Sequence, residues 1–363
     1  MARRTKEEYV ALAEHALIEL IREEGAILRP EAQAKLSDRR HPSVPVPLDP
    51  HHITTAFHRL APYLRQTIAR TRGGRAIGVW HLSNTEGILR KVTDAAARKR
   101  LLHARYLSWA TGTKTKGRSL VGEAGEQVVH ASLRAANGYT LVRPNGGDVT
   151  SFLGAPVPGG PLDNAALLLP LDAATGLPHG PYAVPIEVKN VQQWLYPENH
   201  LLHQLLFKAA SLQAMNPNVW FVPVLVCRKA HYLTTLMARQ MGFYVLPTIR
   251  QYIAPSVASD DAGLRSLNEV RDELGYLLEP HNGEVPEMVK HFNTTIPSVA
   301  SRTAELWRTV GSRFAPIYEQ LRKPTLSQRS DVAADLATAV SELLGEPVSW
   351  YRTDAQLGSG FDE

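Results

Sequence analysis

The sequence has a single cysteine and no long apolar run. Cys227 alone cannot form a disulfide within the chain or supply a multi-cysteine zinc site, which is typical of a reducing compartment. No stretch reaches the roughly 18 apolar residues of a membrane span, and the start, MARRTKEEYV, lacks the apolar segment of a signal peptide. Because 44% of the residues are hydrophobic, wholesale disorder is excluded. We therefore expect a soluble, cytoplasmic protein with no membrane partner.

Positive charge is concentrated in the first third of the chain. Residues 1–118 contain 22 Lys and Arg against 11 Asp and Glu, a net of +11, whereas the remainder has 18 against 24, a net of −6. Lys and Arg release condensed counterions when they bind phosphates, so this asymmetry predicts a polyanionic partner such as double-stranded DNA. An ordinary solvated basic surface is the alternative. The length of 363 residues predicts two or three domains.

Residues 1–84 have the pattern of three helices followed by a hairpin. Thr5 and Gly25 are suited to cap a helix over residues 6–24. The further expected elements are a short helix near 31–36, a proline-rich loop at 41–48, a helix beginning at Asp49-Pro50 and a hairpin turning at Gly73-Gly74. This order resembles a winged helix-turn-helix domain, whose third helix enters the major groove and whose hairpin contacts phosphates.

By position, the resemblance implies a set of DNA-binding residues, and a protein-interaction module is the alternative use of the same fold. The implied residues on the third helix are His51, His52, Thr54, Thr55, His58 and Arg59, and those on the hairpin are Arg70, Arg72 and Arg75. A basic helix and linker over 85–116 is expected to join this domain to the next.

Residues 117–255 predict an α/β domain, because continuous apolar strands alternate with helices and so require cover on both faces of a sheet. Within it, residues 182–189 form a strand on which Glu187 and Lys189 share one face. If 172–179 is the loop before this strand, paired positions sum to about 351, which places Asp163 within a residue or so of Glu187. Two carboxylates and a lysine should therefore converge at one end of a hairpin.

This convergence suits a hard divalent cation. Mg²⁺, or Mn²⁺ in its place, prefers oxygen ligands and keeps several waters. The expected metal ligands are the carboxylates of Asp163 and Glu187 and the backbone carbonyl of Val188. Lys189 would position the attacking water and offset charge on the phosphorus.

The same residues resemble the PD-(D/E)XK nuclease superfamily, including its Holliday junction resolvase-like members. The similarity lies in GEAGE, Asn137-Gly138-Tyr139, Pro161-Leu162-Asp163 and Glu187-Val188-Lys189. It implies a restriction-endonuclease-like mixed sheet flanked by helices. The implied catalytic residues are Glu126, Asp163, Glu187, Lys189 and Gln204. Glu123 competes with Glu126 for the helix position, and Asp148 competes with Asp163 because a Gly/Pro-rich insertion precedes Asp163.

The expected function is that of a metal-dependent DNA endonuclease, which the family resemblance connects with restriction or phage defence. A DNA-binding regulator or assembly subunit with a non-catalytic nuclease-like scaffold is the alternative, and junction resolution and RNA cleavage stay open. Residues 256–363 predict a helical C-terminal region for packing or oligomerisation, with a homodimer as one option.

Overall fold

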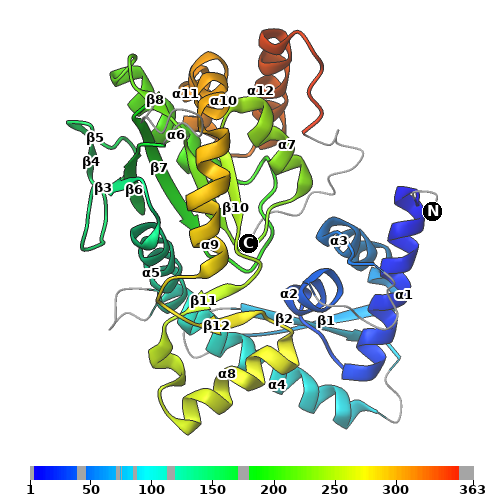
Figure 1. Cartoon of the computed structure of the whole chain (residues 1–363). Coiled ribbons are helices and arrows are strands. Elements are labelled where there is room, and N and C mark those ends of the chain that lie inside the picture. The colour runs from blue at the N-terminus through cyan, green and yellow to red at the C-terminus, as the bar shows by residue number, and fades with distance from the viewer. Residues whose placement is uncertain are drawn as a thin grey trace. The chain divides into compact units, whose positions relative to one another are not determined.

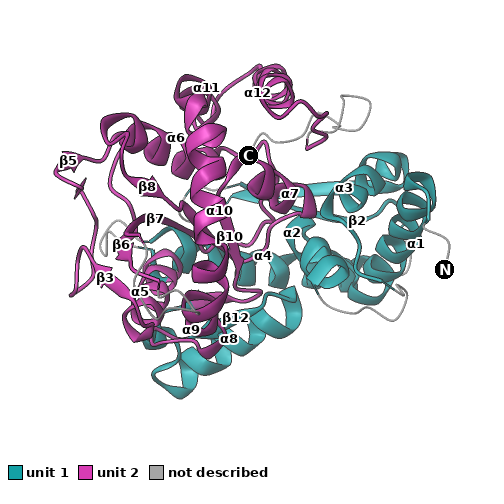
Figure 2. Ribbon diagram, turned by 45° about the horizontal axis from the view of Figure 1, so that its top comes forward, with its two compact units in different colours: residues 1–120, 253–280 teal, residues 121–252, 281–363 magenta. Residues whose placement is uncertain are grey.

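The computed structural model divides into two compact units (Figure 2). It describes residues 4–38, 46–70, 74, 76–84, 88–112, 119–170 and 180–350. Unit 1 comprises residues 1–120 and 253–280, and unit 2 comprises residues 121–252 and 281–363. The expected C-terminal region, 256–363, is therefore shared between the units. In the part of the chain that the structure describes, no helix combines the length and apolar character that crossing a membrane requires.

Unit 1 contains the helices and hairpin expected from the sequence. Its elements are α1 (Lys6–Glu24), α2 (Arg29–Gln33), η1 (Ala34–Asp38), α3 (Pro50–Arg59), η2 (Ala61–Tyr63), β1 (Leu64–Arg70), β2 (Ala76–Leu82), α4 (Leu89–Thr111), η3 (Pro255–Ala258), α8 (Asp261–Leu274) and β12 (Leu278–Pro280). Thr5 and Glu8 form a capping box at the start of α1, and Gly25 ends it at φ 79°. The predicted bounds of this helix are confirmed.

The core of unit 1 lies between α1, α3 and the hairpin. Leu17 and Leu20 of α1 pack with Ile53 and Phe57 of α3. Strands β1 and β2 are antiparallel, from Leu64 opposite Leu82 to Arg70 opposite Ala76. This is the hairpin that the Gly-Gly pair predicted.

Unit 2 is built on a mixed sheet in the order β10-β9-β7-β6-β3, with β8 also paired to β7 (Figure 1). The strands of this sheet are β3 (Tyr139–Leu141), β6 (Asn164–Leu168), β7 (Tyr182–Lys189), β8 (Trp220–Phe221), β9 (Val224–Cys227) and β10 (Tyr244–Pro247). β4 (Ser151–Phe152) and β5 (Ala155–Pro156) form a separate two-stranded sheet, and β11 (Gln251–Ile253) includes the residues at which the sequence passes from unit 2 to unit 1. β6 is antiparallel to β3 and β7, whereas β9 is parallel to β7 and β10. The fold is thus of the mixed α/β class.

Helices cover both faces of this sheet. They are α5 (Leu120–Ala135), α6 (His200–Met215), α7 (Tyr232–Met241), α9 (Pro286–Lys290), η4 (His291–Thr295), α10 (Ile296–Thr309), η5 (Gly311–Phe314), α11 (Ala315–Leu321) and α12 (Arg329–Leu344). Ala183 of β7 belongs to the core under α6, α11 and α12, whereas Val184 and Ile186 belong to the core under α5, α9 and α10. Figure 1 shows α9 and α10 lying along that second face.

One predicted strand, residues 219–227, is two strands in the structure. Pro223 separates β8 from β9, because proline has no N–H to donate to the ladder. β8 pairs with β7 at Tyr182 and Ala183, and β9 resumes the pairing at Ile186. β7 is the central strand of the sheet, between β9 and β6, and its carboxyl end lies beside that of β9.

Candidate active site

The pairing register of β6 with β7 determines which residues meet at the end of β7. Asn164 lies opposite Ile186, so paired positions sum to 350, one less than the sequence predicts. Continuing this register places Asp163 beside Glu187. The backbone N–H of Val188 donates to Oδ2 of Asp163 over 2.6 Å. The expected approach of Asp163 to the end of β7 is therefore present.

Glu187 is almost fully buried, at 1% exposure, and its carboxylate accepts from two ammonium groups. Nζ of Lys189 donates to Oε2 over 2.7 Å, and Nζ of Lys208 donates to Oε1. Lys208 also donates to the carbonyl oxygen of Pro161 over 2.5 Å. Glu187 and Lys189 are therefore not a solvent-exposed surface ion pair, which would contribute little, because Glu187 is buried.

Strand alternation explains why these groups meet. Glu187 and Lys189 have the same parity as Ala183, which faces the α6 side of the sheet. Lys208 lies on α6 and therefore approaches them from above that face. The two lysines and the glutamate thus form one buried charged cluster at the end of a core strand.

The site shifts the pKa values of its two carboxyl groups in opposite directions. Burial, with the adjacent charge of Glu187, raises the pKa of Asp163 to about 7. Burial also opposes ionisation of Glu187, but Lys189 and Lys208 outweigh it and hold the pKa of Glu187 below its usual range. Burial opposes the charged form of Lys189 as well, yet Glu187 and Asp163 raise its pKa overall. Strongly perturbed acids beside a lysine are typical of functional sites.

Of the two acidic residues on α5, Glu126 is the one whose charge reaches the cluster. It raises the pKa values of both Asp163 and Lys189. Its backbone carbonyl accepts from Nδ2 of Asn164 over 3.5 Å, which ties α5 to the start of β6. Glu123 instead accepts from Gln127 over 3.2 Å. The electrostatic effect of Glu126 on Asp163 and Lys189 therefore favours Glu126 at the helix position that the sequence left open.

Helix α6 presents a polar stripe that includes Gln204. His200, Gln204 and Lys208 follow one another at intervals of four residues and so share one helical face. Burial, with the charges of Arg329 and Lys189, lowers the pKa of His200. Gln204 is half-buried between these two residues. Lys208 bonds Glu187 from α6, and the sequence prediction did not include it.

His203, on the same helix, is fully buried. Its Nε2 bonds the carbonyl of Pro197 over 2.8 Å and its ring stacks near Tyr318. Asp148, the alternative to Asp163 as the metal-binding aspartate, is exposed. Only Asp163 of these two aspartates has a described bond to the end of β7.

The donor set at the end of β7 can hold a hard cation. The carboxylates of Asp163 and Glu187 and the carbonyl of Val188 are all oxygen donors, and Mg²⁺ is commonly bound through one or two carboxylates plus waters. Among the described residues no group of three or more His, Cys, Asp or Glu is arranged to hold a metal. Any cation here would therefore rely on two carboxylates and on water or phosphate oxygens.

The predicted DNA-binding residues of α3 are partly engaged with α1. His52 stacks on Tyr9 with ring centroids 5.5 Å apart, and Arg59 donates to Glu7 over 2.8 Å. His51, Thr54 and Thr55 are half-buried, His58 is exposed, and Arg70 is exposed at the end of β1. Arg72 and Arg75 lie outside the described residues. Tyr9 thus covers one face of the His52 ring, and Glu7 offsets the charge of Arg59.

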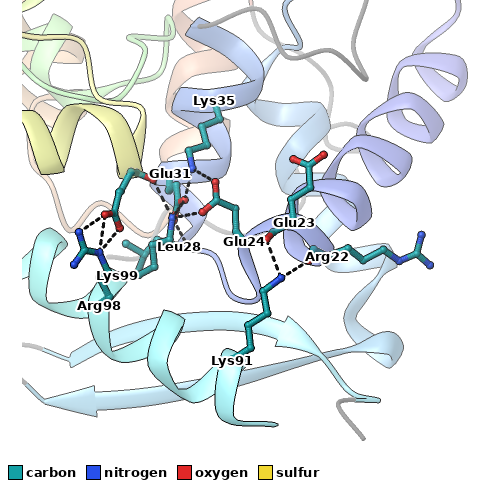
Figure 3. A network of polar contacts seen from close by, with 10 residues as sticks. Arg22, Glu23, Glu24, Leu28, Glu31, Lys35, Lys91, Arg98 and Lys99 are labelled. Atoms are coloured by element: carbon teal, nitrogen blue, oxygen red, sulfur yellow. Dashed lines mark hydrogen bonds and ion pairs between the residues drawn. The ribbon is translucent and has the colours of Figure 1, made fainter. Parts of the chain in front are cut away.

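The basic residues of α4 are also committed within unit 1 (Figure 3). Nζ of Lys99 donates to Glu24 over 2.7 Å, to Glu31 over 2.5 Å and to the carbonyl of Glu273 over 2.9 Å. The other contacts are Lys91 to the carbonyls of Arg22 and Glu23, Arg98 to Glu273, Arg100 to Thr67 and Arg105 to Glu269. Much of the positive charge of this helix is therefore paired within unit 1, and the buried Lys99 is the member expected to contribute most to stability.

The acidic residues of the segment 253–280 reduce the net charge of unit 1 without reversing it. Residues 1–120 carry +11, and residues 253–280 carry two basic and six acidic residues, or −4, so unit 1 carries +7.

Comparison with family models, with curated proteins and with solved structures finds no match to this chain. Function must therefore be argued from the site itself.

Proposed function

We propose that the chain is a metal-dependent endonuclease that hydrolyses phosphodiester bonds in double-stranded DNA. The observation that supports this most is the meeting of Asp163, Glu187 and Lys189 at the end of β7, with Glu126 nearby on α5. Helices on both sides of a mixed sheet support a restriction-endonuclease-like core. The net positive charge of unit 1, with its helices and hairpin, supports a winged-helix role in holding duplex DNA.

In the proposed mechanism, Asp163, Glu187 and the Val188 carbonyl would hold Mg²⁺ or Mn²⁺. Such a cation supplies a Lewis acid for the phosphate and lowers the pKa of a bound water. The ammonium of Lys189 would orient the attacking water and offset charge on the phosphate oxygens. Because Lys189 and Glu187 are buried, this electrostatic effect would be stronger than in bulk water. Glu126 would complete the acidic surroundings, and Gln204 would position the water or the substrate from α6.

Plasmid cleavage tests this proposal. Supercoiled DNA would be incubated with Mg²⁺ and the wild type, Lys189→Met, Asp163→Asn or, as a control, Lys290→Met, whose lysine is exposed in the same unit. We expect Lys189→Met to cut at least about 100-fold more slowly, which is the effect of removing one stabilising donor at a reacting centre. Asp163→Asn should also cut much more slowly, because it removes a charged ligand of the proposed metal. Equal cutting by the site variants and the wild type would refute the assignment. Linear duplex, four-way junction, single-stranded DNA and RNA substrates would then define the substrate class.

A second candidate is a DNA-binding regulator or assembly subunit with a non-catalytic scaffold. It is favoured by the two ammonium groups on Glu187, which already neutralise that carboxylate without a metal. It predicts duplex binding that weakens steeply with salt and no metal-dependent cleavage. Fluorescence anisotropy with labelled duplex at two salt concentrations, together with the cleavage assay, distinguishes the two functions. A role in defence or as a homodimer is a further hypothesis within either.

A further inference from the structure

Lys208 holds together the two chain segments that carry the proposed metal ligands. Its side chain is 8% exposed, and its ammonium reaches from α6 to Oε1 of Glu187 on β7. The same ammonium donates to the carbonyl of Pro161, two residues before Asp163. One cation from a covering helix therefore bridges both sides of the β6–β7 hairpin.

The contact uses the side of Glu187 that Lys189 leaves open. Lys189 bonds Oε2, so Lys208 on Oε1 completes the neutralisation of this buried carboxylate. A divalent cation that binds Glu187 must therefore displace one of the two ammonium groups or share an oxygen with it. Both lysines have a flexible four-carbon stem, so either ammonium can withdraw while the backbone stays in place. Lys189 already has a role in the proposed mechanism, whereas Lys208, on another element, has none.

We propose that Lys208 is a built-in counter-cation, which neutralises Glu187 in the metal-free protein and is displaced when a divalent metal binds. The inference rests on the proposed function for the identity of the metal ligands, and it assigns Lys208 a regulatory and positioning role. Occupancy by metal and release of Lys208 would thus be coupled.

Equilibrium binding of Mn²⁺ tests the competition without measuring cleavage. Free Mn²⁺ would be followed by electron paramagnetic resonance in the wild type, Lys208→Met, Lys208→Gln and the control Lys290→Met, with circular dichroism to verify folding. Removing the competing charge is expected to tighten binding about tenfold or more in both Lys208 variants and to leave the control unchanged. Unchanged or weaker binding in a folded Lys208 variant, or no Mn²⁺ binding by any of the proteins, would overturn the proposal.

Chemical labelling of the wild type provides a second measurement that needs no substitution. Acetic anhydride would be applied with and without Mn²⁺, and acetylation of each lysine would be quantified by mass spectrometry. We expect Mn²⁺ to increase labelling of Lys208 at least threefold relative to Lys290. Bound Mn²⁺ with unchanged labelling contradicts displacement.

The two proposals fail in different ways. If Mn²⁺ binds more tightly to Lys208→Met but no nucleic acid is cut, the nuclease function fails and the competition stands. If DNA is cut and Lys208 has no effect on metal affinity or labelling, the competition alone fails.

Discussion

Replacement of Lys99 by Met should destabilise unit 1 strongly. The Lys99 side chain is 3% exposed, and its ammonium donates to Glu24, Glu31 and the carbonyl of Glu273. Methionine preserves most of the volume and removes the charge and all three donors. Glu31, which is fully buried, would keep Lys35 at 2.8 Å and the N–H of Leu28 at 3.2 Å.

The magnitude follows from this partial loss. Removing one member of a buried ion pair costs about 3–5 kcal/mol, because the remaining charge stays desolvated. We expect about 3 kcal/mol here, since Glu31 retains Lys35 and the partly exposed Glu24 can bind water. For a unit of this size each kcal/mol lowers the melting temperature by about 2–4 °C, so the unit 1 transition should fall by about 6–12 °C.

Scanning calorimetry measures this change, with Lys91→Met as the matched control on the same helix. Lys91 caps the carbonyls of Arg22 and Glu23 at the end of α1 and should matter by less than about 1 kcal/mol. Glu31→Leu combined with Lys99→Met removes both buried charges and should recover part of the loss. If the free energies of unfolding of Lys99→Met and the Lys91→Met control differ by less than about 1 kcal/mol, the reasoning is refuted.

Two further predictions concern unit 2. Burial lowers the pKa of His203 to about 3, so between pH 3 and 6.5 the unfolded state binds more protons and stability falls as the pH drops through 6.5. At pH 5 this effect lowers the free energy of unfolding by about 2 kcal/mol. Urea unfolding at pH 7.5 and pH 5 should therefore show that the wild type loses about 2 kcal/mol more stability between the two pH values than His203→Gln does. Equal losses in the two proteins would contradict the prediction. Gly242→Ala should destabilise far more than Gly345→Ala in thermal unfolding, although both have positive φ. A Cβ at Gly242 would lie 2.1 Å from the backbone nitrogen of Trp307, whereas nothing lies within 4 Å at Gly345; similar losses would show that the close approach is unimportant.

Local physics was sufficient to predict the first helix and the hairpin that carries the site. Thr5, Glu8 and Gly25 define the ends of α1 through hydrogen bonds and backbone conformation within a few residues. The period of two residues along β7 placed Glu187 and Lys189 on one face, and the loop length set Asp163 within one residue of its observed register. These features depend on short sequence separations, so the sequence alone determines them.

Tertiary packing decided which charges are available for function. The sequence predicts α4 to be a basic helix, but Lys99 bonds Glu31, which is 68 residues away in the sequence, and the carbonyl of Glu273, which is 174 residues away. Likewise, Lys208 meets Glu187 only because α6 packs over the face of the sheet on which Glu187 lies. Ion pairing in a low-dielectric interior depends on distances between elements, and composition and spacing do not determine those distances.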